Sequence, residues 1–261
     1  MKKWHKIISR CFLFLFLCIL CLMLIHVRSW AQSGDAPQLF LEANQAYEKG
    51  DYQTAANLYE KILNNGIQSG MILYNLGNCY TRLGQTGKAL LSYRRAERLI
   101  PRDSDLKFNL GYILDQRKDK IESKNRIPFA RVFFFWYYWL SLKELLIVFI
   151  VAHCLLWLAA IILLFKPIAL LRWVRILSLC LFLIFGASFG MKAYIQEAID
   201  QGVVVVAEAT VRSGNGPHHS ALFVLHEGAE FSISEEARGC MKIRLADGKI
   251  GWIASTAIQI I

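Results

Sequence analysis

The residues of this 261-residue chain that are best suited to chemistry are its histidines and cysteines. His218 and His219 lie in a stretch rich in glycine and proline, without a cysteine or carboxylate at metal-ligand spacing, and His226 belongs to a β-type segment. Neither Cys79 nor Cys240 precedes a plausible helix and a downstream histidine, as nucleophilic catalysis by cysteine requires. We therefore expect no catalytic residue, no metal site and no cofactor, and we predict that the chain is not an enzyme.

The cysteines also bear on the redox environment. Five of the seven cysteines lie in apolar segments, and neither of the other two belongs to a CxxC motif. For the remaining pair, Cys79 and Cys240, two interpretations stay open: small, semi-buried side chains, or a disulfide in an oxidising compartment.

The composition shows that the chain occupies more than one environment. It is 55% hydrophobic and 19% charged, whereas soluble domains average roughly 45–50% apolar and about 25% charged residues. The excess is concentrated in three apolar segments, residues 11–27, 145–165 and 176–191. The net charge is +10, but many basic residues flank these segments, so membrane topology explains them better than nucleic-acid binding does.

The N-terminal residues have the order of a secretory signal peptide, which we place at 1–31. The basic stretch MKKWHKIISR is followed by an apolar run from Cys11 to Val27 and then by the small residues Ser29 and Ala31. The apolar run is long for a signal, so an uncleaved anchor is the alternative, and it gives the same topology.

Two further segments are predicted to cross a membrane as a hairpin. Residues 145–165 contain no formal charge and are long enough to span the hydrocarbon core, and residues 176–195 form the second span. The loop 166–175 carries three positive charges and no acid, which predicts that it is cytoplasmic. The parts of the chain on either side then face the periplasm from a bacterial inner membrane.

Two features accompany these spans. Residues 123–144 contain seven consecutive aromatic residues, which predicts an interfacial segment at the membrane surface. Gly186 and Gly190 form a GxxxG motif, which permits close approach of helices, and self-packing against the first span is the favoured interpretation.

An internal repeat of 34 residues precedes the spans. A small residue, a turn glycine at Gly50 and Gly84, a second small residue and an aromatic residue all recur at this spacing. The pattern resembles the tetratricopeptide repeat family, with repeats at 36–67 and 70–103 and a capping helix at 104–122. An α-helical solenoid is implied, in which the packing positions are Ala43, Ala55, Tyr59, Gly77, Ala89, Tyr93 and Gly111.

The resemblance to this family implies a concave surface that binds a partner protein. The positions that fall on it are Phe40, Asn44, Tyr47, Glu48, Tyr74, Asn78, Thr81, Arg82, Phe108 and Tyr112. The alternative is that half of these side chains only pack between repeats. Asn44 and Asn75 fit the clamp that some members use for a C-terminal carboxylate, but Phe40, Asp105 and Asn109 stand where its basic residues belong, so we do not expect chaperone-tail capture.

The last segment, residues 200–261, changes to the period-two pattern of β-strands. Five or six short strands punctuated by glycine predict a small barrel. The motifs around Asp247-Gly248 and Gly251-Trp252-Ile253 resemble the bacterial SH3-like family, which implies an SH3-like β-barrel with Trp252 in its core and a role in cell-wall binding or protein contacts.

The order of the modules carries a further resemblance. Signal, repeats, aromatic segment, two-span hairpin and SH3-like barrel follow one another as in the tetratricopeptide-repeat proteins of the Bat (Bacteroides aerotolerance) operon. This resemblance implies a multi-domain membrane protein that acts as a scaffold with von Willebrand factor A membrane proteins and a MoxR-type ATPase, in envelope integrity or oxidative-stress tolerance. The predicted partners are other proteins and the lipid bilayer, with no nucleic acid. The alternative function is an anchor whose barrel holds peptidoglycan.

Overall fold

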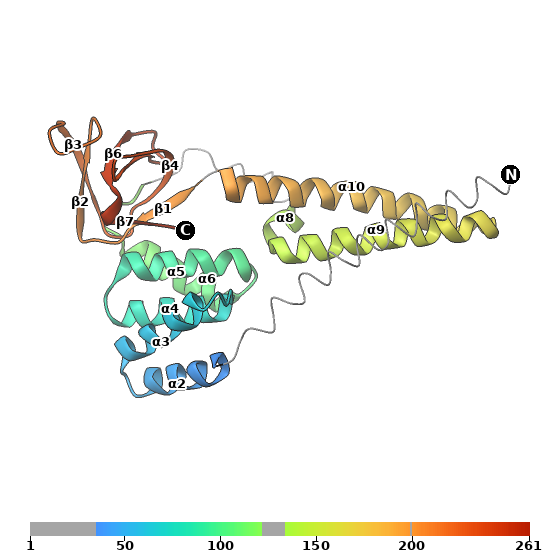
Figure 1. The fold of residues 1–261 in the computed structure, drawn as a ribbon, viewed down its shortest axis with the longest axis horizontal. Coiled ribbons are helices and arrows are strands. Elements are labelled where there is room, and N and C mark those ends of the chain that lie inside the picture. Colours follow the sequence, from blue (N-terminus) through green and yellow to red (C-terminus); the bar gives the residue numbers. More distant parts are fainter. Residues whose placement is uncertain (1–34, 122–133, 199) are drawn as a thin grey trace.

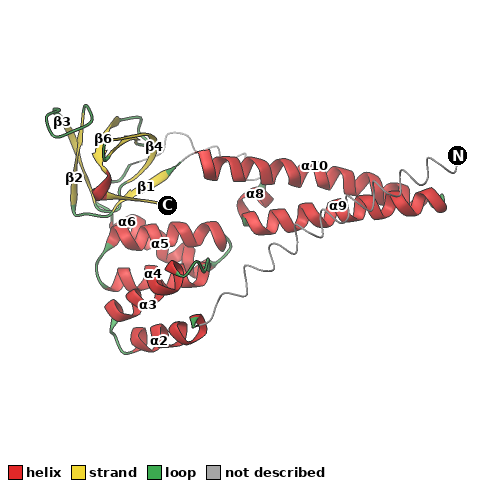
Figure 2. Ribbon diagram, viewed as in Figure 1, coloured by secondary structure: helices red, strands yellow, loops and turns green. Residues whose placement is uncertain are grey.

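The computed structural model describes residues 35–121, 134–198 and 200–261. The predicted signal peptide and residues 123–133 of the predicted aromatic segment lie outside these ranges. Figures 1 and 2 show three parts: a helical array, a long helical hairpin and a β-sheet.

The helical array consists of two antiparallel helix pairs and one further helix. Its helices are α2 (Ala36–Glu48), α3 (Tyr52–Asn64), α4 (Gly70–Arg82), α5 (Thr86–Leu99) and α6 (Ser104–Gln116). Gly50 and Gly84 close the turns within the two pairs with φ of +80° and +71°, a left-handed conformation that glycine adopts without strain. Asp51, Ser69 and Asp103 accept backbone hydrogen bonds at the starts of α3, α4 and α6.

The last helix of the array is shorter than predicted. It ends at Gln116 instead of residue 122, and Arg117 has an extended backbone with φ −63° and ψ 139°. Residues 117–121 instead lie against the C-terminal sheet, where Ile121 packs against the hydrophobic core. Contacts with a distant part of the chain therefore end this helix.

The hairpin consists of the short helix α8 (Phe135–Trp139) and the long helices α9 (Leu142–Phe165) and α10 (Ala169–Ala198). Ser141 and Glu144 form a capping box at the start of α9. Both long helices are long and apolar enough to cross a membrane, and much of their apolar surface is exposed. The second helix begins before the predicted residue 176, because no helix breaker follows Pro167, and the loop shrinks from 166–175 to 166–168.

The sheet is antiparallel and open, so the predicted closed barrel is wrong. Its strand order is β3-β2-β6-β5-β4-β1-β7, and the edge strands β3 and β7 do not pair with each other. The alternating pattern predicts which side chains of a strand face the core, but it does not specify whether the first and last strands of the ladder meet. The strands are β1 (Gln201–Val204), β2 (Glu208–Arg212), β3 (Ala221–His226), β4 (Glu230–Ala237), β5 (Cys240–Arg244), β6 (Ile250–Ala254) and β7 (Ile258–Ile260), with a 3₁₀ turn at Ser255–Ala257.

The orientation of Trp252 also differs from the prediction. In β6 the flanking residues Gly251 and Ile253 are buried, and Trp252 is half-buried on the opposite face. Successive side chains of a strand point to opposite faces, so Ile253 fills the core and Trp252 cannot. A Cβ atom on Gly251 would lie 3.0 Å from the carbonyl oxygen of Arg212 and would overlap Val211, so the close crossing of β2 and β6 requires glycine here.

The structure decides between the two interpretations of the cysteines. Cys79 is a free thiol in the helical core, and Cys240 is a free thiol at the start of β5. Burial raises the pKa of the Cys79 thiol to about 12, so this side chain is a protonated filler.

Candidate protein-binding groove and the contact between the modules

The predicted concave surface is built on a row of aromatic residues 34 positions apart. Phe40 lies against Tyr59 with ring centroids 6.1 Å apart, and Tyr74 lies against Tyr93 at the same distance. Phe108, the third member of the row, is 77% exposed. Its exposure follows from the repeat count, because no second helix follows α6 in the described residues to supply an equivalent of Tyr93.

Hydrogen bonds tie the first repeat to the second across the groove. The Tyr59 hydroxyl donates to Asn44 Oδ1 at 2.5 Å and accepts from Asn75 Nδ2 at 3.3 Å. Burial raises the pKa of Tyr59 to about 12, although the Asn75 bond opposes this, so the hydroxyl remains a donor throughout the physiological range.

The same pattern recurs 34 residues later. The Tyr93 hydroxyl donates to Asn78 Oδ1 at 2.8 Å and lies 3.0 Å from Thr81 Oγ1. Asn109 Nδ2 donates both to Asn78 Oδ1 at 2.9 Å and to the Tyr74 hydroxyl at 3.1 Å. We call the two sets together the Asn/Tyr ladder: Asn44, Tyr59, Asn75, Asn78, Tyr93 and Asn109.

The ladder contains two residues that the predicted surface lacks. Asn75 and Asn109 are 34 residues apart and come from the first helix of successive repeats, so the repeat spacing itself could have identified them. From the sequence they were placed only at positions of a carboxylate clamp, so their role as donors was missed: Asn75 donates to the Tyr59 hydroxyl, and Asn109 donates to the Tyr74 hydroxyl and to Asn78.

The remaining predicted surface residues lie toward the ends of the first helices. Tyr47 makes an edge-on contact with Tyr52 at 5.2 Å, and its hydrogen bond with Arg82 raises the pKa of that guanidinium. Glu48 and Tyr112 are exposed. Arg82 is thus engaged by a neighbouring repeat.

The repeat-packing positions separate into buried and open ones. Completely or almost completely buried are Ala43, Ala55, Tyr59, Ala89 and Tyr93. A Cβ atom on Gly77 would overlap the Tyr93 ring, so the close approach of α4 and α5 requires glycine there. A Cβ atom on Gly111 would meet nothing within 4 Å, because this residue of α6 has no packed neighbour.

Of the two glycines in the GxxxG motif of α10, one is packed against the neighbouring helix and the other is not. A Cβ atom on Gly186 would lie 2.8 Å from the Phe149 ring of α9, which makes Gly186 a contact of the two long helices. Gly190 has nothing within 4 Å of such an atom and lies on open surface.

The helical array and the sheet are joined by an ion network centred on Glu230. Its carboxylate accepts from Arg94 Nε at 2.7 Å and from Arg117 at 2.9 Å. Burial disfavours the charge of Arg94, but its bonds to Glu230 and Glu97 outweigh this and raise its pKa. No sequence pattern indicates this network, because Arg94 and Glu230 are 136 residues apart.

A second set of polar contacts lies beside this network. Asp119 accepts from the backbone nitrogen of His226 at 2.6 Å and lies 3.0 Å from its Nδ1. Glu227 accepts from the backbone nitrogen of Gly87 at 2.9 Å, at the start of α5. A side chain on Gly87 would overlap the carbonyl oxygen of Val204, so helix and sheet meet backbone to backbone.

Apolar packing completes the contact. Val203 of β1 is fully buried in the core of the helical array, and Ile261 packs against the same core. Figure 1 shows the sheet resting on α5, with β1 leading directly from α10. The two modules therefore form one packed unit although the hairpin separates them in the sequence.

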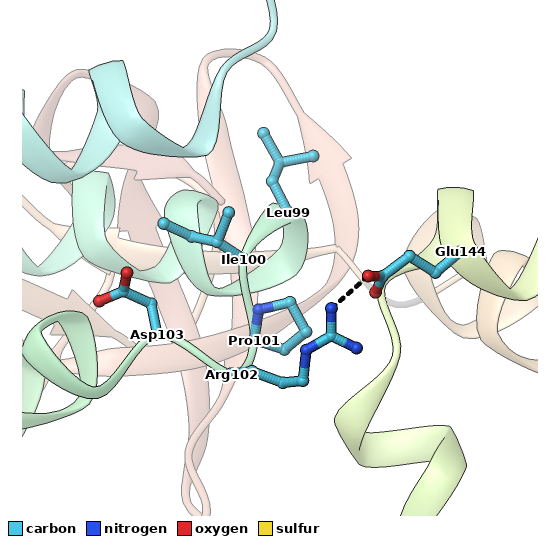
Figure 3. A pocket seen from close by; sticks show the side chains of 6 residues that line it. All are labelled: Leu99, Ile100, Pro101, Arg102, Asp103 and Glu144. Atoms are coloured by element: carbon cyan, nitrogen blue, oxygen red, sulfur yellow. Dashed lines mark hydrogen bonds and ion pairs between the residues drawn. The ribbon is translucent and has the colours of Figure 1, made fainter.

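An open pocket of about 340 Å³ lies where the helical array meets the hairpin (Figure 3). Arg102 forms an ion pair with Glu144 of α9 and lies 5.0 Å from the Trp139 ring. The other lining residues are Leu99, Ile100, Pro101 and Asp103. Arg102 and Glu144 pair with each other, and the Asp103 carboxylate accepts from the backbone nitrogen of Leu106. No group of three or more potential metal ligands occurs in the described residues.

Comparison with known proteins identifies the repeat. Residues 70–103 match the tetratricopeptide repeat family, so the chain contains such a repeat. Among solved structures, the chain is similar to the crystal structure of the Sgt2 TPR domain from Aspergillus fumigatus, at 26% identity and a TM-score of 0.30, over 32% of this chain and 55% of that chain. The chain thus spans about half the length of that structure. No curated protein matches it.

Proposed function

We propose that this chain is a membrane-anchored scaffold that binds an extended segment of a partner protein in the groove of its repeats. The observation that carries this proposal is the set of unused polar atoms on the Asn/Tyr ladder. The amide nitrogens of Asn44 and Asn78 and the amide oxygens of Asn75 and Asn109 have no hydrogen-bond partner among the described residues. Each of the two sets of the ladder, one with Asn44 and Asn75 and the other with Asn78 and Asn109, therefore presents one amide nitrogen and one amide oxygen without a partner in the part of the chain that the structure describes.

These free groups match the main chain of an extended peptide. Every peptide unit of such a segment offers one N–H donor and one carbonyl acceptor, and the aromatic row of Phe40, Tyr74 and Phe108 would take its apolar side chains. The ladder carries no formal charge, and Arg82 is engaged by Tyr47. An internal segment of a protein fits this surface better than a terminal carboxylate does.

Photocrosslinking tests the groove. We expect benzoylphenylalanine at Phe108, which is 77% exposed, to capture one discrete protein in native membranes, whereas the same group at Lys61, exposed on the second helix of the first repeat, should not. The captured partner is then identified and its dissociation constant measured for Phe108→Ala against Lys61→Ala. Equal capture at both positions, or equal affinities of the two variants, would contradict the proposal.

The membrane part of the proposal rests on the hairpin. Its two long helices are long and apolar enough to cross a membrane. The helical array before the hairpin and the sheet after it are in contact, so both modules must lie on the same side of any membrane that the hairpin crosses. The positive connection between the helices favours the cytoplasm for the tip and the periplasm for both modules. A reporter fused after Leu171 should be active only in the cytoplasm and one after Ile261 only in the periplasm; the reverse pattern would refute this topology.

We further propose, from the order of the modules alone, that the scaffold serves an envelope or aerotolerance complex with von Willebrand factor A membrane proteins and a MoxR-type ATPase. Co-purification of such proteins with the full chain, lost in the Phe108→Ala variant, is the expected result. Retention of the full chain by purified cell-wall sacculi would instead favour a peptidoglycan anchor.

A further inference from the structure

The outer face of the sheet carries an aromatic residue between positive charges. Trp252 of β6 lies directly opposite Arg212 of β2 on one side and Lys242 of β5 on the other. Residues paired in this way across antiparallel strands project from the same face. Lys242 Nζ lies 5.8 Å from the centre of the Trp252 ring, so the ammonium group lies over the ring.

The next pair along the same two strands extends this surface. Arg244 and Ile250 are opposite each other, two residues from Lys242 and Trp252, and Ile250 is 40% exposed. We call these five residues the cationic-aromatic patch: Arg212, Lys242, Arg244, Ile250 and Trp252.

The patch has an excess of positive charge. Among the described residues its three cations form one ion pair, between Lys242 and Glu235 at 3.4 Å. Arg212 donates one hydrogen bond, from Nη1 to the carbonyl oxygen of His219 at 2.9 Å. Arg244 is exposed and makes no ion pair with another described residue. The patch therefore has cationic donors without a partner in the described ranges, beside the half-buried ring of Trp252 and the exposed side chain of Ile250.

From this arrangement we infer that the outer face of the sheet binds an acidic, aromatic-containing segment of a protein. Carboxylates on the partner would pair with Arg244 and Arg212, and apolar side chains would cover Trp252 and Ile250, a combination typical of interface anchors. Figure 1 shows β2 on the side of the sheet remote from the hairpin, whereas β1 joins α10. This placement favours a partner in the aqueous phase over an anionic membrane surface.

Fluorine NMR of the full chain in neutral detergent tests the inference. All seven tryptophans are replaced by 5-fluorotryptophan, and the Trp252 signal is assigned with Trp252→Phe. A short peptide of repeated Glu-Phe-Asp units should shift this signal saturably, and added salt should weaken the effect. The matching peptide of repeated Lys-Phe-Lys units should leave the signal unchanged.

Charge variants make the test specific. Lys242→Gln combined with Arg244→Gln should weaken binding of the acidic peptide by about fivefold, as expected for the loss of two exposed charge contacts. Lys61→Gln removes an exposed charge from α3 and should change nothing. All other tryptophans lie outside the sheet, so an unchanged thermal unfolding transition is used to show that the double variant remains folded. The inference is overturned if the acidic peptide causes no shift, if the basic peptide causes the same shift, if the double variant binds normally, or if only phosphatidylglycerol vesicles shift the signal.

Discussion

The carboxylate of Glu230 offers the most direct test of how the two modules hold together. In the Glu230→Gln variant one carboxylate oxygen becomes an NH₂ donor, which must then face a guanidinium donor of Arg94 or Arg117. Glu97 provides the matched control, because it also pairs with Arg94, at 2.8 Å, but within the same helix.

The magnitude follows from the burial of these groups. A hydrogen bond to a charged group contributes about 1.5–3 kcal/mol when shielded, and exposed ion pairs contribute at most about 1 kcal/mol. Glu230 is 26% exposed and makes bonds to two arginines that are 27% and 13% exposed, so an intermediate cost of about 2 kcal/mol is expected for its loss. Loss of the Glu97 pair, an i,i+3 contact that is 38% exposed, should cost no more than about 0.5 kcal/mol.

Hydrogen exchange of the full chain measures this difference where it acts. The amides of β1, which rests on α5, should exchange roughly 30-fold faster in Glu230→Gln, because 1.4 kcal/mol corresponds to about a tenfold change in the opening equilibrium. Exchange in Glu97→Gln should stay within about threefold of the native chain. Equal acceleration in both variants, or none in either, would show that the Glu230 network does not hold the sheet on the helical array.

Two further predictions concern the helical array. Gly77→Ala should lower the free energy of unfolding by about 1–3 kcal/mol, because the added Cβ atom would overlap the buried Tyr93 ring. Gly111→Ala should raise the free energy of unfolding by up to about 1 kcal/mol, because alanine favours the helix more than glycine does. Thermal denaturation followed by circular dichroism distinguishes the two variants, and equal effects would refute the packing assigned to Gly77. The Cys79 thiol, whose pKa burial raises to about 12, should resist iodoacetamide at pH 8 in the native chain and react after denaturation; peptide mapping that finds it alkylated in the native chain would contradict its burial.

The sequence alone was sufficient for features that local spacing encodes. The 34-residue recurrence predicted the helix pairs, because each repeat must present the same small and aromatic side chains to its neighbours, but Gly111 of the last helix has no packed neighbour. The two apolar segments predicted helices long enough to span a membrane, since length and hydropathy are properties of one continuous stretch. In the groove, the resemblance to the repeat family implied Asn44 and Asn78 as surface residues but did not include Asn75 and Asn109.

Only the tertiary structure decided how these pieces meet. An alternating strand pattern does not state which strands become the edges, so the open order of the sheet and the outward position of Trp252 differ from the prediction. The bonds of Glu230 to Arg94 and Arg117 join residues more than 100 positions apart, and a charged side chain has the same local pattern whether it pairs or faces water. Local periodicity determined the elements of this protein, whereas the contact that makes one unit of its repeats and its sheet depended on the folded chain.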